Sequence, residues 1–490
     1  MKIKNGFLTY VFIFLGLVVG TFLVLVAVML LRPGTSIFGL QWANKNEYAL
    51  YTSVEHFEDF DKYDIITINS ISKNADGKTN ENGYYDIIFR AGTDDAVNSN
   101  IKIENKVTGL IKSSEAESFK VEIVKDVVDE QKRLTINVYQ LNTWIAFSDQ
   151  CTITVNIPYN ISLSNTKLEA NTASGFVNFG GQKGDDATPT ELNASFFEAK
   201  TQNGNISVQS FANANRYDFT TTKGSIYVNR NISTILTKFK TTSGNISAKE
   251  IISSRVELSS DSGTIETDDI KIYPSLNPFL ETEDKLVSID TKRSVVRIDD
   301  IVGNVVFTEQ TESPNVKIGK VEGDLGLIYG NNVKLSAENI TGFTDIKIEK
   351  GDISIGNKDD STLYGLAGRT NIELKSGSLH AIITDDNDEV VNINAKNARV
   401  NLNIEKINNT VTIETEKGDV DLTLQQTVST NLVSKTQATL KYVWKDISFK
   451  GADHVEEIRG TDPYVEGKDI SVTSINGDII VNRISELVWN

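Results

Sequence analysis

The chain has 490 residues, of which 39% are hydrophobic and 23% charged, so it carries enough apolar material for a core and is not disordered as a whole. Its 49 basic and 66 acidic residues leave a net charge of −17, which disfavours binding to nucleic acids. The single cysteine, Cys151, allows no intrachain disulfide and no paired-cysteine zinc site, and we interpret it as a small buried hydrophobe.

The first element is an uncharged apolar run, Phe7–Leu31. As a helix it would be about 37 Å long, enough to cross a bilayer core with some tilt. Lys2 and Lys4 precede it, which favours a cytoplasmic tail over residues 1–6 and an extracytoplasmic C-terminal body. The run is longer than the apolar part of a signal peptide and ends without a small-residue cleavage site. We therefore predict an uncleaved, single-pass anchor in the cell membrane over residues 7–31 rather than a cleaved signal peptide.

Residues 41–150 are predicted to form a smaller, membrane-proximal β region. Short apolar alternations separated by Asn, Gly and Asp turns are typical of an antiparallel sheet or sandwich. The runs expected as strands are Asp64–Ile71, Tyr84–Phe89, Phe119–Val124 and Leu134–Trp144. We expect this region to cap the open end of the following domain, and the sequence leaves open whether it is an independent domain.

Residues 151–490 contain a repeat of about 20 residues. A glycine with an aliphatic residue two positions later recurs at Gly204, Gly224, Gly244 and Gly263, at intervals of 20, 20 and 19 residues. Apolar residues stand mostly seven and five positions before the glycine, and Thr or Ser usually three before it. The predicted repeat corners are Gly175, Gly204, Gly224, Gly244, Gly263, Gly303, Gly323, Gly351, Gly377, Gly418 and Gly477.

Each unit is predicted to be one turn of an elongated, parallel β-solenoid, so the fold class is all-β. Apolar residues two apart lie on one face of a strand and would point inward, while glycine permits a tight or positive-φ corner. Thr and Ser at strand ends would bond the backbone of the turn. Ser294 replaces a corner glycine, and Gly303 follows nine residues later, which indicates at least two corners in each turn. Stacked units would bury one continuous core.

Insertions interrupt this period. We interpret them as insertions that loops tolerate for no functional reason; the alternative is a binding role, because insertions in solenoids collect as loops on a face that often carries binding. The insertions are Tyr273–Glu283, Lys358–Gly368, Asp385–Glu389 and Thr427–Gly467.

One segment carries a family signature. Between Thr152 and Val177, a strand, Pro158, a turn and a second strand lead to Thr-x-Ser-Gly and an aliphatic residue. The Ser-Gly corners at Gly244 and Gly263 continue the pattern. The segment resembles the bacterial family of β-strand-repeat proteins known as "putative adhesins", clearly over about 151–307 and loosely beyond. The resemblance implies a surface-exposed β-solenoid, commonly tethered by an N-terminal helix, and it supplies no catalytic or binding residue.

Few residues suggest chemistry. The three histidines, His56, His380 and His454, do not stand at metal-ligand spacing, and no nucleophile or phosphate-loop motif occurs in a suitable strand–helix context. The carboxylate candidates for a glycan-cleaving or calcium site are Asp299-Asp300, Asp359-Asp360 and Asp385–Glu389. The last run lacks the order of a calcium loop, so we interpret it as solvated, and calcium binding there stays open. We predict no enzyme activity, no catalytic or metal-ligating residue and no cofactor; the ligand-binding residues stay undetermined.

Three functions fit these features. The main hypothesis is a non-enzymatic, adhesin-like surface protein that projects from the cell and binds a cell-envelope or external partner, protein or glycan. The alternative is a self-associating envelope scaffold or stress-response accessory, and the oligomeric state stays open. The third is a glycan-active β-helix enzyme that uses Asp385 and Asp388.

Overall fold

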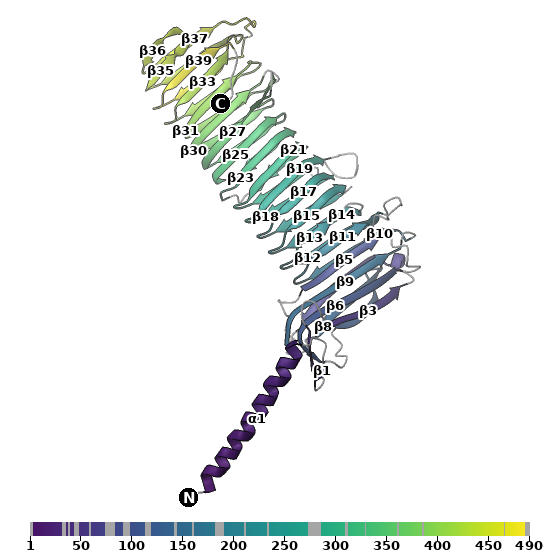
Figure 1. Cartoon of the computed structure of the whole chain (residues 1–490). Helices are drawn as coiled ribbons and strands as arrows, with labels where there is room; N and C mark the ends of the chain where they lie inside the picture. Colours follow the sequence, from purple (N-terminus) through teal and green to yellow (C-terminus); the bar gives the residue numbers. More distant parts are fainter. Residues whose placement is uncertain are drawn as a thin grey trace. The chain divides into compact units, whose positions relative to one another are not determined.

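The computed structural model is mostly β, with one N-terminal apolar helix (Figure 1). It describes residues 3–31, 36–37, 40–43, 49–57, 60–73, 84–91, 99–112, 119–141, 145–158, 161–181, 191–209, 212–232, 235–272, 286–308, 312–328, 330–359, 362–384, 387–464 and 466–485. The chain forms two compact units, Met1–Ser207 and Val208–Asn490.

Helix α1 (Ile3–Leu31) contains the predicted apolar run. Its segment Thr9–Val28 has a mean hydropathy of 3.0, and none of it is buried in the protein. A core helix of a soluble protein would be covered by other elements, whereas this helix is apolar all round and exposed. By length and composition α1 is able to cross a membrane, and a signal sequence would have the same features.

The first unit contains thirteen described strands and one short 3-10 helix. They are β1 (Ser36–Ile37), β2 (Leu40–Ala43), β3 (Ala49–Phe57), η1 (Phe60–Lys62), β4 (Ile65–Lys73), β5 (Tyr84–Ala91), β6 (Ser99–Lys112), β7 (Phe119–Val128), β8 (Gln131–Leu141), β9 (Ile145–Ile157), β10 (Leu163–Thr172), β11 (Val177–Gly181), β12 (Leu192–Thr201) and β13 (Ile206–Val208). The four strands predicted over residues 41–150 correspond to β4, β5, β7 and β8.

Pairing in the first unit is mixed. Strands β3, β6 and β9 pair antiparallel, as do β7 and β8. In contrast, β4 lies parallel between β8 and β10, and β5 lies parallel between β9 and β11. The antiparallel arrangement expected over residues 41–150 is therefore found only in part, because β4 and β5 already stack as solenoid strands. Strand β9 crosses residue 150, and whether residues 41–150 fold independently stays a prediction.

The second unit contains the following described elements. They are β14 (Ala212–Thr221), β15 (Ile226–Ile232), β16 (Leu236–Thr241), β17 (Ile246–Ser253), β18 (Val256–Ser260), β19 (Thr264–Ile272), β20 (Leu286–Thr291), β21 (Val295–Val302), β22 (Asn304–Phe307), β23 (Asn315–Glu322), β24 (Leu325–Ile328), β25 (Asn331–Ile340), β26 (Thr344–Ile348), β27 (Lys350–Ile355), β28 (Asn357–Asp359), β29 (Thr362–Tyr364), β30 (Thr370–Ile383), β31 (Val391–Ile404), β32 (Val411–Thr415), β33 (Val420–Gln425), β34 (Thr430–Thr436), β35 (Thr439–Tyr442), η4 (Val443–Lys445), β36 (Ile447–Lys450), β37 (Asp453–Ile458), β38 (Ile470–Ser474) and β39 (Ile479–Ile484).

These strands stack as the predicted parallel solenoid. One column runs through β16, β18, β20 and β22. The other runs through β17, β19, β21 and β23 (Figure 1). One turn therefore contributes a strand to each column, with β20 and β21 as an example. Ser294 precedes β21 and Gly303 precedes β22, so these two residues lie at different corners, as predicted.

The interior is a stack of equivalent apolar positions. In the second unit Phe219 and Phe239 stack with ring centroids 5.4 Å apart, and Leu258, Ile289 and Phe307 occupy the same position in successive strands. All five side chains are buried. Because each fully buried side chain of this size contributes roughly 1.5–3 kcal/mol, the column is a main source of stability.

Hydroxyl side chains connect the corners of successive turns. The Oγ1 atom of Thr241 accepts a hydrogen bond from the backbone N–H of Gly244 and donates one to the carbonyl oxygen of Gly224, both at 3.0 Å. Ser260 makes the equivalent pair of bonds to Gly263 and Gly244, at 3.0 and 3.3 Å. The prediction that Thr and Ser bond the turn backbone is confirmed at these corners.

The glycines meet two different needs. Gly303 has φ +133°, a conformation that side chains other than glycine rarely adopt. At Gly244 the need is space, because an added Cβ would overlap the carbonyl oxygen of Gly224 in the turn beneath. Two other predicted corner residues, Gly351 and Gly377, lie within strands β27 and β30.

The C-terminal insertion changes the order of stacking. Strands β34 and β35 pair in parallel with β38 and β39, while β36 and β37 add antiparallel to β35 and β34. The other edges of β38 and β39 pair with β32 and β33. The last strands in the sequence therefore lie between earlier ones, and the inserted strands form the end of the stack. Gly477 lies directly against the carbonyl of Gly418.

Candidate functional site

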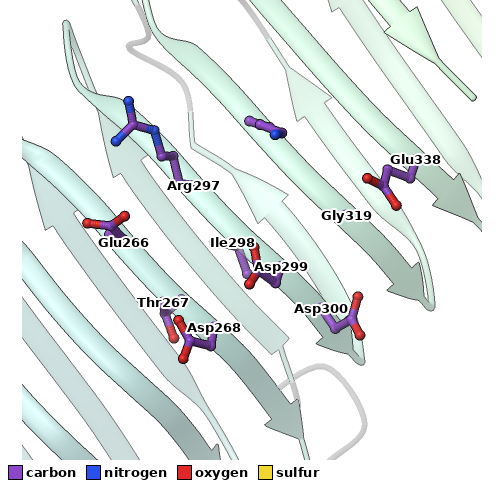
Figure 2. A pocket seen from close by; sticks show the side chains of 10 residues that line it. Glu266, Thr267, Asp268, Arg297, Ile298, Asp299, Asp300, Gly319 and Glu338 are labelled. Carbon is purple, nitrogen blue, oxygen red and sulfur yellow. The ribbon is translucent and has the colours of Figure 1, made fainter. Parts of the chain in front are cut away.

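A shallow pocket lies on the outer face of β19, β21, β23 and β25 (Figure 2). It has a volume of about 310 Å³. The residues that line it are Glu266, Thr267, Asp268, Arg297, Ile298, Asp299, Asp300, Lys317, Gly319 and Glu338.

A bend in each strand produces this pocket. In β21, Ile298 and Ile301 both point into the core although they are three residues apart, so Asp299 and Asp300 both face solvent. The register places Thr267 opposite Ile298, which continues the bend into β19. Strict alternation would have exposed only one residue of the Asp pair. The bend therefore doubles the density of charged side chains along this line.

Gly319 opens the pocket between two carboxylates. It occupies the bend of β23, between the strands that carry Asp299 and Glu338. It has no side chain to fill the gap, and an added Cβ would overlap the carbonyl oxygen of Asp299. Asp300 is held by a 3.3 Å hydrogen bond from the backbone N–H of Lys320 to its Oδ1 atom. The pocket is thus a gap in a row of outward side chains.

Five carboxylates and two cations surround the pocket. Glu266, Arg297 and Lys317 occupy one register position on β19, β21 and β23, so the two cations follow an acid across neighbouring strands. The remaining carboxylates lie along the bend. Among the described residues, no group of three or more His, Cys, Asp or Glu side chains is arranged to hold a metal ion. This geometry suits ion pairs and hydrogen bonds with a polar ligand or protein surface.

A charged network continues from the pocket along the same line of bends, through β19 to β17. Lys271 Nζ lies 3.0 Å from both Asp269 and Glu250. These hydrogen bonds, first that to Asp269, raise the pKa of Lys271 above its usual value. The outer face therefore presents mixed charge in fixed positions, while the inner face of the same strands is apolar or hydroxyl-bearing.

The sequence of the whole repeat matches a known family model. The model described as Toastrack DUF4097 matches residues 86–482. The chain belongs to the toastrack DUF4097 family. The match begins within β5, which agrees with the finding that β4 and β5 already stack as solenoid strands. It also extends the predicted family resemblance beyond residues 151–307.

Solved structures similar to this toastrack chain have distant sequences. A "putative adhesin" from Parabacteroides merdae is 11% identical, with 68% of this chain and 97% of that chain covered and a TM-score of 0.24. A "putative adhesin" from Parabacteroides distasonis is 9% identical, with 89% and 97% covered and a TM-score of 0.23. A "putative cell adhesion protein" from Clostridium sporogenes is 7% identical, with 89% and 100% covered and a TM-score of 0.16. No curated protein matches. At these TM-scores the likenesses support no argument about function.

The three histidines lie on three different strands. His56 is exposed on β3, and His380 is half-buried on β30, where burial lowers its pKa. His454 on β37 lies 3.2 Å from Glu456. None of the three belongs to the pocket.

The acidic residues considered as glycan-cleaving or calcium-binding candidates lie in different parts of the structure. Asp299 and Asp300 line the pocket. Asp359 ends β28, while Asp360, Asp385 and Asp386 lie outside the described residues. In the acidic loop, Asn387 is buried and donates to the carbonyl oxygens of Leu366 and Gly368, both at 3.0 Å, whereas Asp388 and Glu389 are exposed.

An aromatic cluster in the C-terminal insertion escaped the sequence analysis. Tyr442 and Trp444 have ring centroids 5.1 Å apart, and Phe449 stacks on His454 at 4.8 Å. Burial raises the pKa of the nearby Glu456, but hydrogen bonds from Lys445 and His454 outweigh it and leave that pKa below its usual value. The cluster lies on β35, η4, β36 and β37, at the end of the stack. The aromatic content of the insertion was the only sequence signal.

Proposed function

We propose that this protein is a non-enzymatic, membrane-anchored surface protein that binds a cell-envelope or external partner through the outer face of its solenoid. The anchor is α1, uncleaved and single-pass, with the N-terminus in the cytoplasm. The exposed apolar surface of α1 and the lysines at positions 2 and 4 support this topology.

The observation that carries the proposal is the division of side chains between the two faces of each strand. In β19 and β21 the inward residues are apolar or hydroxyl-bearing and buried, while charged residues face outward around the pocket. Charged groups held in register on a rigid sheet give specificity for a partner with complementary charge. The pocket at Asp299 and Glu338 is the proposed centre of that contact.

Binding is tested with the full chain in lipid nanodiscs and washed envelope or wall fragments as the probe. We expect co-sedimentation of the wild type, and a several-fold loss in the variant Asp299→Asn with Glu338→Gln, because both walls of the pocket lose charge. Glu414→Gln on the exposed side of β32 is the matched control and should bind normally. A wild type that binds none of the envelope or wall fractions would contradict the proposal.

The non-enzymatic part of the proposal has its own test. A panel of polysaccharides incubated with the full chain should yield no new reducing ends. Polysaccharide cleavage that is lost in Asp299→Asn or Asp300→Asn would instead identify the pocket as a glycan-active site.

A self-associating envelope scaffold is the second candidate. The observation that favours it is a strand edge in the first unit to which no described strand pairs.

A further inference from the structure

Strand β7 lies at the edge of its sheet. It pairs with β8 through a full antiparallel register from Phe119–Gln140 to Val128–Gln131, and no strand among the described residues pairs with its other edge. Asp129 and Glu130 form the two-residue turn with φ +53° and +67°, as a type I′ hairpin requires. An open edge presents unpaired backbone groups to any chain that can add to it.

The core-side face of the sheet continues uncovered onto β7. Leu134 and Ile136 of β8 are buried, and Lys125 and Ile123 lie opposite them on the same face. Ile123 is 39% exposed and Val127, further along this face, is 67% exposed. Apolar residues aligned with a core yet open to solvent indicate a surface that another molecule covers.

Charge decides which register β7 can adopt with a second copy of itself. In a two-fold antiparallel pair, residues facing each other lie on the same side of the sheet, so paired residue numbers have the same parity. Centring the pair on Ile123 places Lys120 of each copy opposite Asp126 of the other. Centring it on Val124 opposes Glu122 to Asp126. Centring it on Glu122 or Lys125 opposes each residue to its own copy, so three of the four longest registers bring like charges together.

We propose that two copies of this protein associate through β7, edge to edge and antiparallel, with Ile123 at the two-fold axis. The sheet then continues from one copy to the other. The exposed apolar residues Ile123 and Val127 of one copy lie beside the same face of β7 in the second copy. Lys120 and Asp126, which would otherwise discourage edge pairing, form two matched pairs in this register. The association needs no external partner, so it stands or falls independently of the proposed binding function.

Disulfide trapping tests the register directly in the full chain in membranes. Ile123→Cys places two thiols opposite each other, whereas Val127→Cys places them about eight residues, or roughly 27 Å, apart. The native Cys151 is buried and serves as an internal background. Mild oxidation should give a covalent dimer for Ile123→Cys and none above background for Val127→Cys, although Val127 is the more exposed residue.

Charge reversal provides the second test. Lys120→Asp and Asp126→Lys should each weaken dimerisation roughly tenfold, because both symmetric pairs become repulsive. The double variant restores the pairs and should recover the dimer, which a general loss of folding would not do. Three results would each overturn the proposal. The first is equal disulfide trapping at positions 123 and 127, and the second is a wild type that stays monomeric in nanodiscs. The third is a double variant that dimerises no better than the single variants.

Discussion

At the corner formed by Gly244, the absence of a side chain is required by the turn beneath. An added methyl group would overlap the carbonyl oxygen of Gly224, so Gly244→Ala must displace one turn from its neighbour. We expect the free energy of unfolding to fall by about 2–3 kcal/mol, as for other overpacked sites. Gly326→Ala is the control, since its nearest contact would be an ordinary 3.5 Å to Val306. Urea denaturation compares the stabilities of Gly244→Ala and Gly326→Ala. Equal stability of the two variants would contradict the explanation that a side chain at position 244 overlaps the turn beneath.

The hydroxyl of Thr241 is the second part of this corner. Thr241→Val keeps the shape but leaves the N–H of Gly244 and the carbonyl of Gly224 without this partner in a buried site. Since each buried unpaired group costs about 1–3 kcal/mol, a loss of roughly 2–4 kcal/mol is expected in thermal or urea unfolding. Thr222→Val, at an exposed position in the corner of the preceding turn, should be within about 0.5 kcal/mol of the wild type. A Thr241→Val protein as stable as this control would rule out the hydroxyl bridge.

The ionisation of Glu198 makes the stability of the fold depend on pH. Burial raises its pKa, but hydrogen bonds from Lys167 and Lys200 outweigh burial and leave the pKa below its usual value. A carboxylate with a lowered pKa stabilises the fold above its unfolded pKa of about 4.3, and this stability is lost as pH falls through the folded value. Glu198→Gln should therefore cost about 1 kcal/mol at pH 7, and less as the pH falls below 4. Urea unfolding midpoints of the wild type and Glu198→Gln at pH 7 and below pH 4 test this prediction, with the exposed Glu130→Gln as the control. A stability difference that stays the same at both pH values would contradict it.

At the scale of elements, local pattern predicted the strands far better than their partners. The spacing around Ser294 and Gly303 is enough to predict two corners in a turn, because side-chain alternation and turn chemistry are local. The same alternation in β4 does not reveal whether the next strand adds parallel or antiparallel, so β4 was assigned to an antiparallel region. In the pocket, the Asp299-Asp300 pair was visible in the sequence. Its bend and the gap at Gly319 depend on stacking between turns and were not.

The stacking of β38 between β32 and β34 makes the end of the solenoid depend on a late segment. Val472 is buried and lies in register with Ile413 on one side and Ser434 on the other. Val472→Asp buries a charge at this joint and should cost about 3 kcal/mol or more. Hydrogen exchange should rise first over residues 430–458, which β38 connects to the rest of the unit. Residues 226–252 should stay protected.

Ser471→Asp is the control for this experiment. Ser471 is half-exposed on the opposite face of β38, so its substitution leaves the core untouched. Uniform loss of protection across the second unit in Val472→Asp would show that the inserted strands are not a separately weakened end.

At the scale of the whole molecule, the proposed function depends on where the body is placed. In the described strands around the pocket, the inner face is apolar or hydroxyl-bearing and the charged side chains lie on the outer face. That surface can meet a cell-envelope or external partner only if the body lies outside the cytoplasm. The topology of α1 therefore links the fold to the function.

The anchor is tested on protein isolated from membranes of the native host. We expect the intact mass to include residues 1–31, because the apolar run ends without a small-residue cleavage site. The protein should resist carbonate extraction, and protease added to intact spheroplasts should digest the body but spare the first residues. Lys2→Glu with Lys4→Glu should lower the share of chains in this orientation, while Lys350→Glu on the exposed side of β27 should not. A mature N-terminus beyond residue 31 would show instead that α1 is a signal sequence, and the body would then reach its partner without a membrane anchor.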